Sequence, residues 1–201
     1  TLSLHDALPI YNQLEVVREF AKTVDIITFD HEHVPLAVLE ALEAEGVAVQ
    51  PPSQALRFAQ NKLLMRERLS ELGLPMPAWA RIESAEELQD FLAANGGVAI
   101  LKTPIGGYDG KGVRVVRSVG DAADWLAEGK PLLAEEKVNF VREVAQLSAR
   151  NPSGEIATWP LVQTVQRDGV CAEVLAPAPN PHGLIEEADR IARTIAQGLG
   201  V

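Results

Sequence analysis

The stretch Lys102-Thr-Pro-Ile-Gly-Gly-Tyr-Asp-Gly-Lys-Gly112 lies between two short apolar runs, residues 98–101 and 113–116. Each run has the length and composition of a buried strand, so the sequence predicts a hairpin with a glycine-rich loop. Glycines permit positive φ and let backbone N–H groups approach a ligand, and successive N–H groups can form an anion site. Lys102 and Lys111 add positive charge beside the loop. We hypothesise a flap over nucleotide phosphates; the alternative is an ordinary glycine-rich turn with surface lysines.

The composition limits the classes of function. The chain has 201 residues, enough for one large or two small domains, and a net charge of −10. A broad nucleic-acid surface would need a basic footprint, which this balance disfavours. The single cysteine, Cys171, suits a reducing cytoplasm and is expected to be a small core residue. Because no apolar run reaches the roughly 18 residues of a membrane helix, we expect a cytoplasmic protein that binds neither membranes nor nucleic acid.

The first third of the chain alternates helices with short strands. Residues 1–10 show no clear period and are set apart as a segment of uncertain or artefactual origin. The elements predicted after them are helices over 11–23 and 34–45 and strands over 25–29 and 47–49. This alternation is typical of an α/β layer with parallel strands. We interpret residues 11–52 as the C-terminal part of an N-terminal α/β domain.

The remainder predicts an α+β domain over residues 53–201. Ser53 is the expected N-cap of one helix that runs to Leu72, and Ser84-Ala-Glu-Glu87 is a capping box for the next. Asp121 is expected to cap a further short helix. The remaining predicted elements are strands over 131–138, 142–150, 156–165 and 170–175 and an amphipathic helix over 184–199.

Several charged residues lie where predicted elements end. Lys102 follows a buried strand, where its ammonium could reach phosphates; the alternative is a surface lysine whose stem covers apolar groups. Glu135 and Glu136 end another strand and could read an adenine edge, or could simply form a charged junction. Glu143 could accept from ribose hydroxyls, and Lys62 could be an ordinary solvated residue on its helix.

Other candidate motifs are weaker. His31 and His33, with Asp30 and Glu32, resemble a metal cluster, but no third ligand is evident and we predict no metal site there. The glycine loop is not a Walker A motif, because a strand follows it and no Lys-Ser/Thr pair opens a helix.

Taken together, these motifs resemble the ATP-grasp ligases, and within them the ATP-dependent carboxylases of purine biosynthesis. The resemblance covers about residues 24–201. It is carried by Thr28–Pro35, Ala59-Gln-Asn-Lys62, Leu72-Gly-Leu-Pro75, Ile100-Leu-Lys102, Gly106-Gly-Tyr-Asp-Gly-Lys-Gly112, Glu135-Glu-Lys-Val-Asn-Phe140 with Glu143, Trp159-Pro160 and Gln166-Arg-Asp-Gly169. It implies the tail of a Rossmann-like, pre-ATP-grasp domain followed by a partial ATP-grasp domain with a glycine-rich flap.

The resemblance also assigns roles to individual residues. It implies that Lys62 and Lys102 contact ATP phosphates, that Glu143 binds the ribose and that Gln166 lines the nucleotide site. Of the flap, Tyr108 and Asp109 approach the imidazole substrate and are the catalytic candidates. The residues assigned to the flap are Gly106, Gly107, Tyr108, Asp109, Gly110, Lys111 and Gly112, and those assigned to adenine are Glu135, Glu136, Lys137 and Val138.

The implied reaction joins bicarbonate to aminoimidazole ribonucleotide through carboxyphosphate, with ATP and Mg²⁺ as cofactors and a homodimer as the common assembly. The resemblance places the Mg²⁺ ligands after Val201, so this chain is expected to be an internal fragment that is inactive alone. Ala172 departs from the pattern that the resemblance implies, in which many members have arginine. Two alternatives stay open: another ATP-grasp carboxylate–amine ligase, and a non-catalytic ATP-binding module.

Overall fold

The computed structural model describes residues 10–107 and 112–201. The chain divides into two compact units, one of residues 1–60 with 199–201 and one of residues 61–198. Within the described residues, no helix has the length and apolar character needed to cross a membrane.

The first unit is mainly helical. Its elements are η1 (Ile10–Asn12), α2 (Leu14–Ala21), α3 (Leu36–Ala44) and α4 (Ser53–Gln60). Their core gathers Ile27, Val34, Val38, Leu39, Leu42, Val49 and Leu56. The two predicted strands reduce to one parallel bridge between Ile27 and Val49 in the described part of this unit. The parallel direction is as expected, but an isolated pair without flanking strands gives little support for longer strands.

The helix predicted from Ser53 to Leu72 is present over most of that range, but the prediction of one continuous helix is wrong because the chain breaks at Asn61. Helix α4 ends at Gln60, and α5 (Lys62–Glu71) begins after an extended residue, Asn61. The Asn61 side chain accepts hydrogen bonds from the amides of Leu63 and Leu64, at 3.0 and 3.3 Å. Asparagine therefore acts as the N-cap of α5 and satisfies amides that a continuous helix would bond internally.

A four-stranded antiparallel sheet organises the second unit. Its strands are β1 (Trp79–Ile82), β2 (Ala99–Lys102), β3 (Val113–Val116) and β4 (Leu132–Glu136), in the order β1-β4-β2-β3. The predicted hairpin around the glycine loop is confirmed as β2–β3, with Lys102 opposite Val113. Strand β1 was not predicted, because its short sequence follows prolines and carries no clear alternation.

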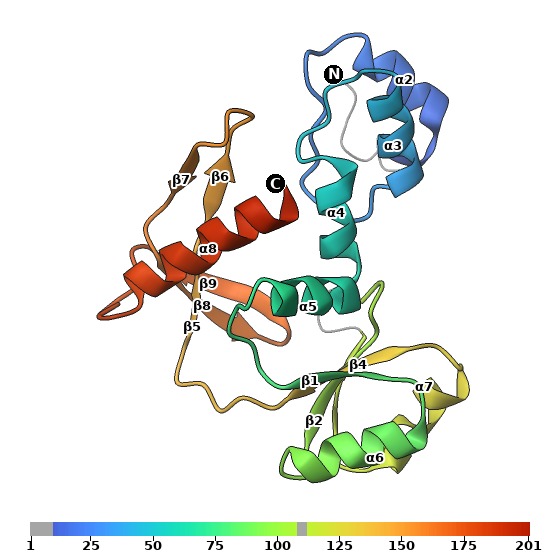
Figure 1. The fold of residues 1–201 in the computed structure, drawn as a ribbon, viewed down its shortest axis with the longest axis vertical. Coiled ribbons are helices and arrows are strands. Elements are labelled where there is room, and N and C mark those ends of the chain that lie inside the picture. Colours follow the sequence, from blue (N-terminus) through green and yellow to red (C-terminus); the bar gives the residue numbers. More distant parts are fainter. Residues whose placement is uncertain (1–9, 108–111) are drawn as a thin grey trace. The chain divides into compact units, whose positions relative to one another are not determined.

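Two helices, α6 (Ala85–Ala94) and α7 (Ala123–Ala127), and the 3₁₀ helix η2 (Val119–Ala122) accompany the four-stranded sheet. Figure 1 shows α6 and α7 on one side of the sheet and α5 on the other. Leu88 and Leu92 of α6 pack in one core cluster with Leu101 and Ala134 of the sheet. Side chains alternate between the faces of a strand, so Lys102 and Glu135 face away from that core.

Two helix caps were predicted in this part of the chain. One of them is confirmed and the other is wrong. Ser84 and Glu87 form the predicted capping box. Asp121 is not the N-cap of a helix: Ser118 occupies that position for η2, and the Asp121 carboxylate accepts from the amides of Arg117 and Ser118. Asp121 is thus the second half of a capping box, whose spacing the sequence contains but our prediction missed.

The C-terminal part contains two small sheets and a long helix. One sheet has the order β5 (Glu143–Ala145), β8 (Val162–Arg167), β9 (Val170–Leu175), and the other pairs β6 (Ser148–Arg150) with β7 (Ile156–Thr158). The predicted strands 142–150 and 156–165 are each split between these sheets. Pro160 lacks an N–H and cannot continue a ladder between β7 and β8.

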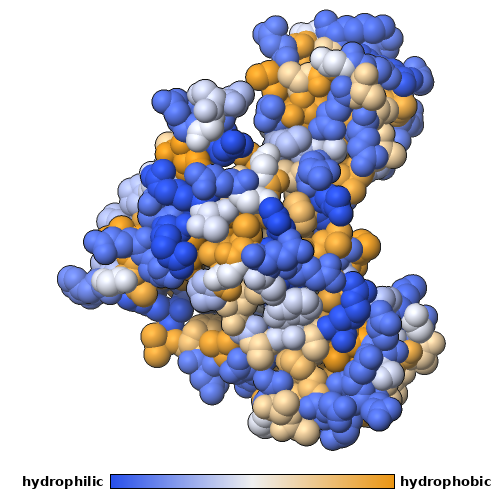
Figure 2. Space-filling view, in the orientation of Figure 1, coloured by the Kyte–Doolittle hydropathy of each residue, from blue (hydrophilic) through white to orange (hydrophobic). Residues whose placement is uncertain are grey.

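Helix α8 (Ile185–Leu199) is joined to β7 by its polar side chains. Asp189 accepts from the Thr158 hydroxyl at 2.7 Å, and Arg193 donates to the Ile156 carbonyl at 3.0 Å. Cys171, expected in the core, is exposed because β9 is exposed along its length. Figure 2 shows hydrophobic residues interspersed with hydrophilic ones on the visible face.

Candidate functional site

A buried carboxylate, Glu135, is the centre of the candidate site. It lies on β4 with only 4% of its surface exposed. One carboxylate oxygen, Oε1, accepts from the Arg66 guanidinium of α5, and the other, Oε2, pairs with the Lys102 ammonium of β2. The pairing of Glu135 with Lys102 follows from the register, because Lys102 lies opposite Leu133 and therefore diagonal to Glu135.

The charges of these three residues do not cancel. Burial opposes ionisation of Glu135 most strongly, but the hydrogen bonds and charges of Lys102 and Arg66 outweigh it and lower the pKa of the carboxyl. Glu135 is therefore an anion at neutral pH, and two cations share it. The Arg66 and Lys102 side chains remain 23% and 24% exposed. The cluster carries a net positive charge at a partly open surface, which suits an anionic ligand.

Helix α5 connects this cluster to the glycine loop. Lys62 and Arg66 are four residues apart and share one face of the helix. The Lys62 amide donates to the Pro104 carbonyl at 2.9 Å, and its ammonium donates to the Gly106 carbonyl at 3.0 Å. The first residue of α5 thus holds the segment that leads into the loop.

The described glycines of the loop have the backbone conformation that the hypothesis needs. Gly106, Gly107 and Gly112 have φ of +71°, +78° and +76°. The Thr103 amide donates to the Gly112 carbonyl at 3.0 Å, which closes the base of the loop. A Cβ on Gly112 would lie 2.5 Å from Thr103 Oγ1, so a side chain does not fit there. Tyr108, Asp109, Gly110 and Lys111 lie outside the described residues.

The other predicted nucleotide residues follow β4 or lie on the second sheet. Glu136 is exposed and bonds the Ala78 backbone through both its amide and its carboxylate. Lys137 and Val138 are exposed in the segment after β4. Glu143 on β5 is opposite Thr164 of β8, and Gln166 lies two residues further along β8, next to an irregularity in the ladder.

The predicted site residues therefore form two groups. Lys62, Lys102 and Glu135 meet around the base of the glycine loop, whereas Glu143 and Gln166 share the three-stranded sheet. Arg66 was not predicted, although it contacts Glu135 directly. Its spacing of four residues from Lys62 on a helix was the available signal, but nothing in the sequence indicated which carboxylate it would meet.

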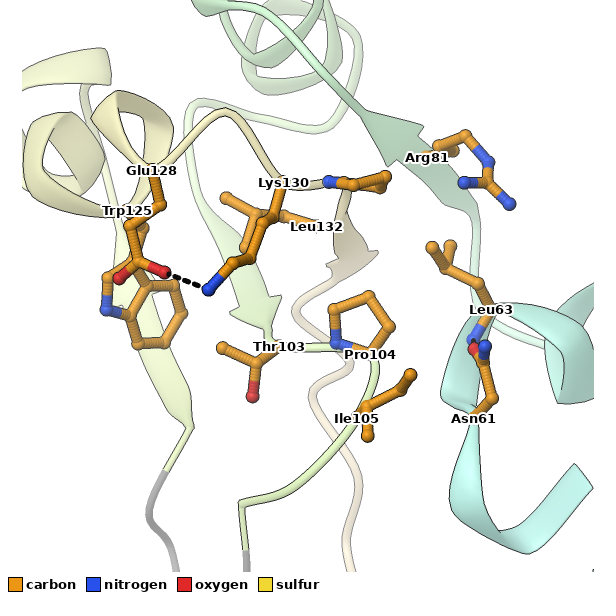
Figure 3. A pocket seen from close by; sticks show the side chains of 11 residues that line it. Asn61, Leu63, Arg81, Thr103, Pro104, Ile105, Trp125, Glu128, Lys130 and Leu132 are labelled. Atoms are coloured by element: carbon orange, nitrogen blue, oxygen red, sulfur yellow. Dashed lines mark hydrogen bonds and ion pairs between the residues drawn. The ribbon is translucent and has the colours of Figure 1, made fainter. Parts of the chain in front are cut away.

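A cavity of about 370 Å³ lies beside this cluster but does not include it. Figure 3 shows Trp125 and Glu128 on one side, Leu63 and Arg81 on the other, and Thr103, Pro104 and Ile105 between them. Its cations are already paired, Lys130 with Glu128 and Arg81 with Glu67. Since Lys62, Lys102 and Glu135 do not line this cavity, it is not the candidate site.

No metal centre emerges from the part of the chain that the structure describes. The rings of His31 and His33 lie 5.6 Å apart. In residues 10–107 and 112–201, however, no group of three His, Cys, Asp or Glu side chains could hold an ion.

Comparison with protein families gives two matches along the chain. The model of the ATP-grasp domain matches residues 67–201, and that of the ribonucleotide synthetase preATP-grasp domain matches residues 4–60.

Individual relatives share one name. The N5-carboxyaminoimidazole ribonucleotide synthase of Mycobacterium tuberculosis is 47% identical over 196 residues, which are 95% of this chain and 46% of the relative. That of Corynebacterium ammoniagenes is 48% identical over 191 residues, covering 91% and 46%. The chain thus spans about half the length of these relatives.

Solved structures agree with these relatives. The Thermus thermophilus N5-carboxyaminoimidazole ribonucleotide synthetase has a TM-score of 0.84 at 30% identity, covering 94% of this chain and 52% of that one. The Aspergillus clavatus synthase complexed with ATP has a TM-score of 0.81 at 33% identity, covering 94% and 50%. The predicted fold class, a pre-ATP-grasp segment followed by ATP-grasp structure, is confirmed.

Proposed function

The chain belongs to the ATP-grasp family, and we propose on that basis that it forms the ATP-binding part of a carboxylating ligase. The proposed enzyme carboxylates aminoimidazole ribonucleotide with bicarbonate to give 5-(carboxyamino)imidazole ribonucleotide in de novo purine biosynthesis. The observation that carries the proposal is the positively charged cluster of Arg66, Lys102 and Glu135, next to a glycine loop that Lys62 holds. Support for the substrate comes from the names of relatives that match nearly all of this chain.

In this proposal the nucleotide is bound by residues of both sheets. Lys62, Lys102 and the loop amides bind the phosphates. Glu143 binds the ribose, and Gln166 lines the site. Adenine is read by Glu135, Glu136, Lys137 and Val138, and the imidazole substrate is approached by Tyr108 and Asp109.

The chemistry has two steps. A bicarbonate oxygen attacks the γ-phosphorus of ATP, which releases ADP and forms carboxyphosphate. The substrate amine then takes the carboxyl group, phosphate leaves and the amine loses a proton. Positioned ammonium groups and loop amides stabilise the negative charge of the transferring phosphoryl group.

Mg²⁺ is the proposed second cofactor, and when bound it would neutralise phosphate charge during phosphoryl transfer. The residues described here offer no group of three potential ligands, so the ion is assigned to none of them.

The wider organisation is also a proposal. Residues 11–52 would be the tail of the pre-ATP-grasp domain and residues 53–201 the ATP-grasp domain, with residues 1–10 set apart. The protein would work in the cytoplasm as a homodimer on small molecules, without nucleic acid or membrane. The second candidate function is a sibling ATP-grasp ligase that acts on another purine intermediate or a carboxylate.

The test is ADP formation by the protein in the full length that its gene encodes. We expect ADP release that requires both bicarbonate and aminoimidazole ribonucleotide. ADP release with another amine or carboxylate substrate would instead identify a sibling ligase. ATP binding without ADP release under any of these conditions would identify a non-catalytic module.

A further inference from the structure

The cluster around Glu135 contains one more cation than charge balance requires. Lys102 alone would neutralise the carboxylate, yet Arg66 reaches it from a different element, 69 residues earlier in the chain. A buried carboxylate with only one ammonium partner would form a neutral pair. An ammonium in such a pair is a weaker partner for a phosphate, because its charge is already compensated.

We infer that Arg66 is a positioning residue that compensates Glu135 and so leaves the charge of Lys102 available to nucleotide phosphates. This inference rests on the proposed function, since it needs a phosphate-bearing ligand at Lys102. Arg66 acts on Lys102 through its contact with Glu135.

The hydrogen-bond arrangement supports this division of roles. Arg66 directs both Nε and Nη2 to Oε1 of Glu135, whereas Lys102 takes Oε2. Each cation therefore has its own carboxylate oxygen, and neither has to be displaced when the other binds a ligand. A guanidinium is well suited to the Arg66 position, since it stays protonated and presents several donors in one plane.

The helix that carries Arg66 is held in place by hydrogen bonds, which fits a positioning role for this residue. Helix α5 is held at its first residue by the Lys62 amide and ammonium, which bond the carbonyls of Pro104 and Gly106. Near its other end, the Arg68 guanidinium donates to the Gly198 carbonyl at 2.8 and 3.1 Å. These contacts hold α5 at one residue before Arg66 and at one residue after it.

The experiment compares ligands with and without phosphates. ATP, ADP and adenosine are titrated calorimetrically into the full-length wild type, Arg66→Met and Arg66→Lys. We expect Arg66→Met to weaken ATP and ADP by about tenfold or more, the size of one charge-assisted hydrogen bond. Adenosine should change by less than about twofold, well under that amount. Arg66→Lys should keep most of the ADP affinity because it keeps the charge.

A matched control and a compensating double variant sharpen the result. Arg190→Met removes an exposed arginine that pairs with Glu187 on α8 and should leave the ratio of ADP to adenosine affinity unchanged. Adding Glu135→Gln to Arg66→Met removes the uncompensated anion, so this ratio should recover towards the wild-type value. The ratio can be measured in the double variant and in Arg66→Lys even if Arg66→Met alone does not fold.

The outcomes separate the two proposals. Unchanged ADP affinity in Arg66→Met, an equal loss for ADP and adenosine, or a double variant that recovers nothing would each overturn the role of Arg66. A wild-type protein that binds no ATP would refute the proposed function before any variant is made.

Discussion

The ammonium of Lys62 donates a 3.0 Å hydrogen bond to the carbonyl oxygen of Gly106, 44 residues later in the chain. The amide of the same lysine donates to the Pro104 carbonyl at 2.9 Å. One residue at the start of α5 therefore positions the entry of the glycine loop. If Lys62 also binds phosphate, as proposed, the phosphate oxygen and the Gly106 carbonyl are acceptors for the same ammonium group.

Replacing Lys62 by methionine should weaken ATP binding by about tenfold or more, because one charge-assisted hydrogen bond is lost. Lys62→Arg keeps the charge and should bind ATP nearly as the wild type does. Lys22→Met is the control, since Lys22 pairs with Glu19 on an exposed helix surface. Calorimetric titration measures the ATP affinity of all three variants. Equal affinities of Lys62→Met and wild type would remove Lys62 from the nucleotide site.

Replacing Gly112 by alanine should disturb the base of the loop. Its φ is +76°, and the new Cβ would meet Thr103 Oγ1 at 2.5 Å and the Gly107 backbone at 3.1 Å. Gly129→Ala is a matched control, because Gly129 has φ of +63° but nothing within 4 Å of its Cβ position. We expect Gly129→Ala to cost about 1 kcal/mol of unfolding free energy for the backbone conformation alone.

The cost of Gly112→Ala should exceed that of the control, and only this variant should weaken ATP binding. Urea unfolding and ATP titration of both variants test the difference. Equal losses of stability, with ATP affinity intact in both, would show that the loop base tolerates a side chain.

The stability that Glu135 provides should depend on pH. The net lowering of its pKa from the ordinary value of 4.5 means that the folded protein favours the ionised form. Its contribution is therefore complete above about pH 4.5 and is lost as the pH falls through the lower pKa of the folded state. Glu135→Gln should be less stable than wild type at pH 7 by about 1–3 kcal/mol.

Urea unfolding of wild type and Glu135→Gln at several pH values between 7 and 3 provides the measurement. The stability difference should shrink in the acidic part of this series. Glu128→Gln, which breaks an exposed pair with Lys130, should change stability by less than about 1 kcal/mol throughout. A difference for Glu135→Gln that does not vary with pH would contradict the role of its charge.

Replacing Ser84 by alanine should destabilise the second unit without touching the site. The Ser84 hydroxyl accepts from the Glu87 amide at 3.1 Å, and the loss of such a cap costs about 1 kcal/mol. Thermal unfolding should show a lower midpoint, and ATP affinity below that midpoint should stay the same. A variant as stable as wild type would mean that solvent replaces the cap at no cost.

Local rules predicted the parts of the fold that depend on neighbouring residues. The capping box at Ser84 and the hairpin around the glycine loop are examples. The break at Asn61 was missed, because asparagine is compatible with a helix as well as with a cap and its side-chain bonds decide between them. The splitting of the predicted strand 142–150 between two sheets depends on partners that lie elsewhere in the chain.

The candidate site shows the same limit. Lys102 and Glu135 were each identified from their positions at strand ends, but their ion pair depends on the register between β2 and β4. Arg66 could not be assigned a partner, because its carboxylate lies 69 residues away in the chain. Long-range pairing of charges is set by the sheet, and the sheet is not encoded in any one segment.

The alternation along β2 and β4 has a further consequence for how the sequence can vary. Leu101 and Ala134 are fully buried, and each immediately precedes a charged residue of the cluster, Lys102 or Glu135. Substitutions can alter one face and spare the other. A one-residue insertion or deletion within either strand would exchange the two faces, placing a charge in the core and an apolar side chain at the cluster. Length changes should therefore be tolerated in the connections between these strands and not within them.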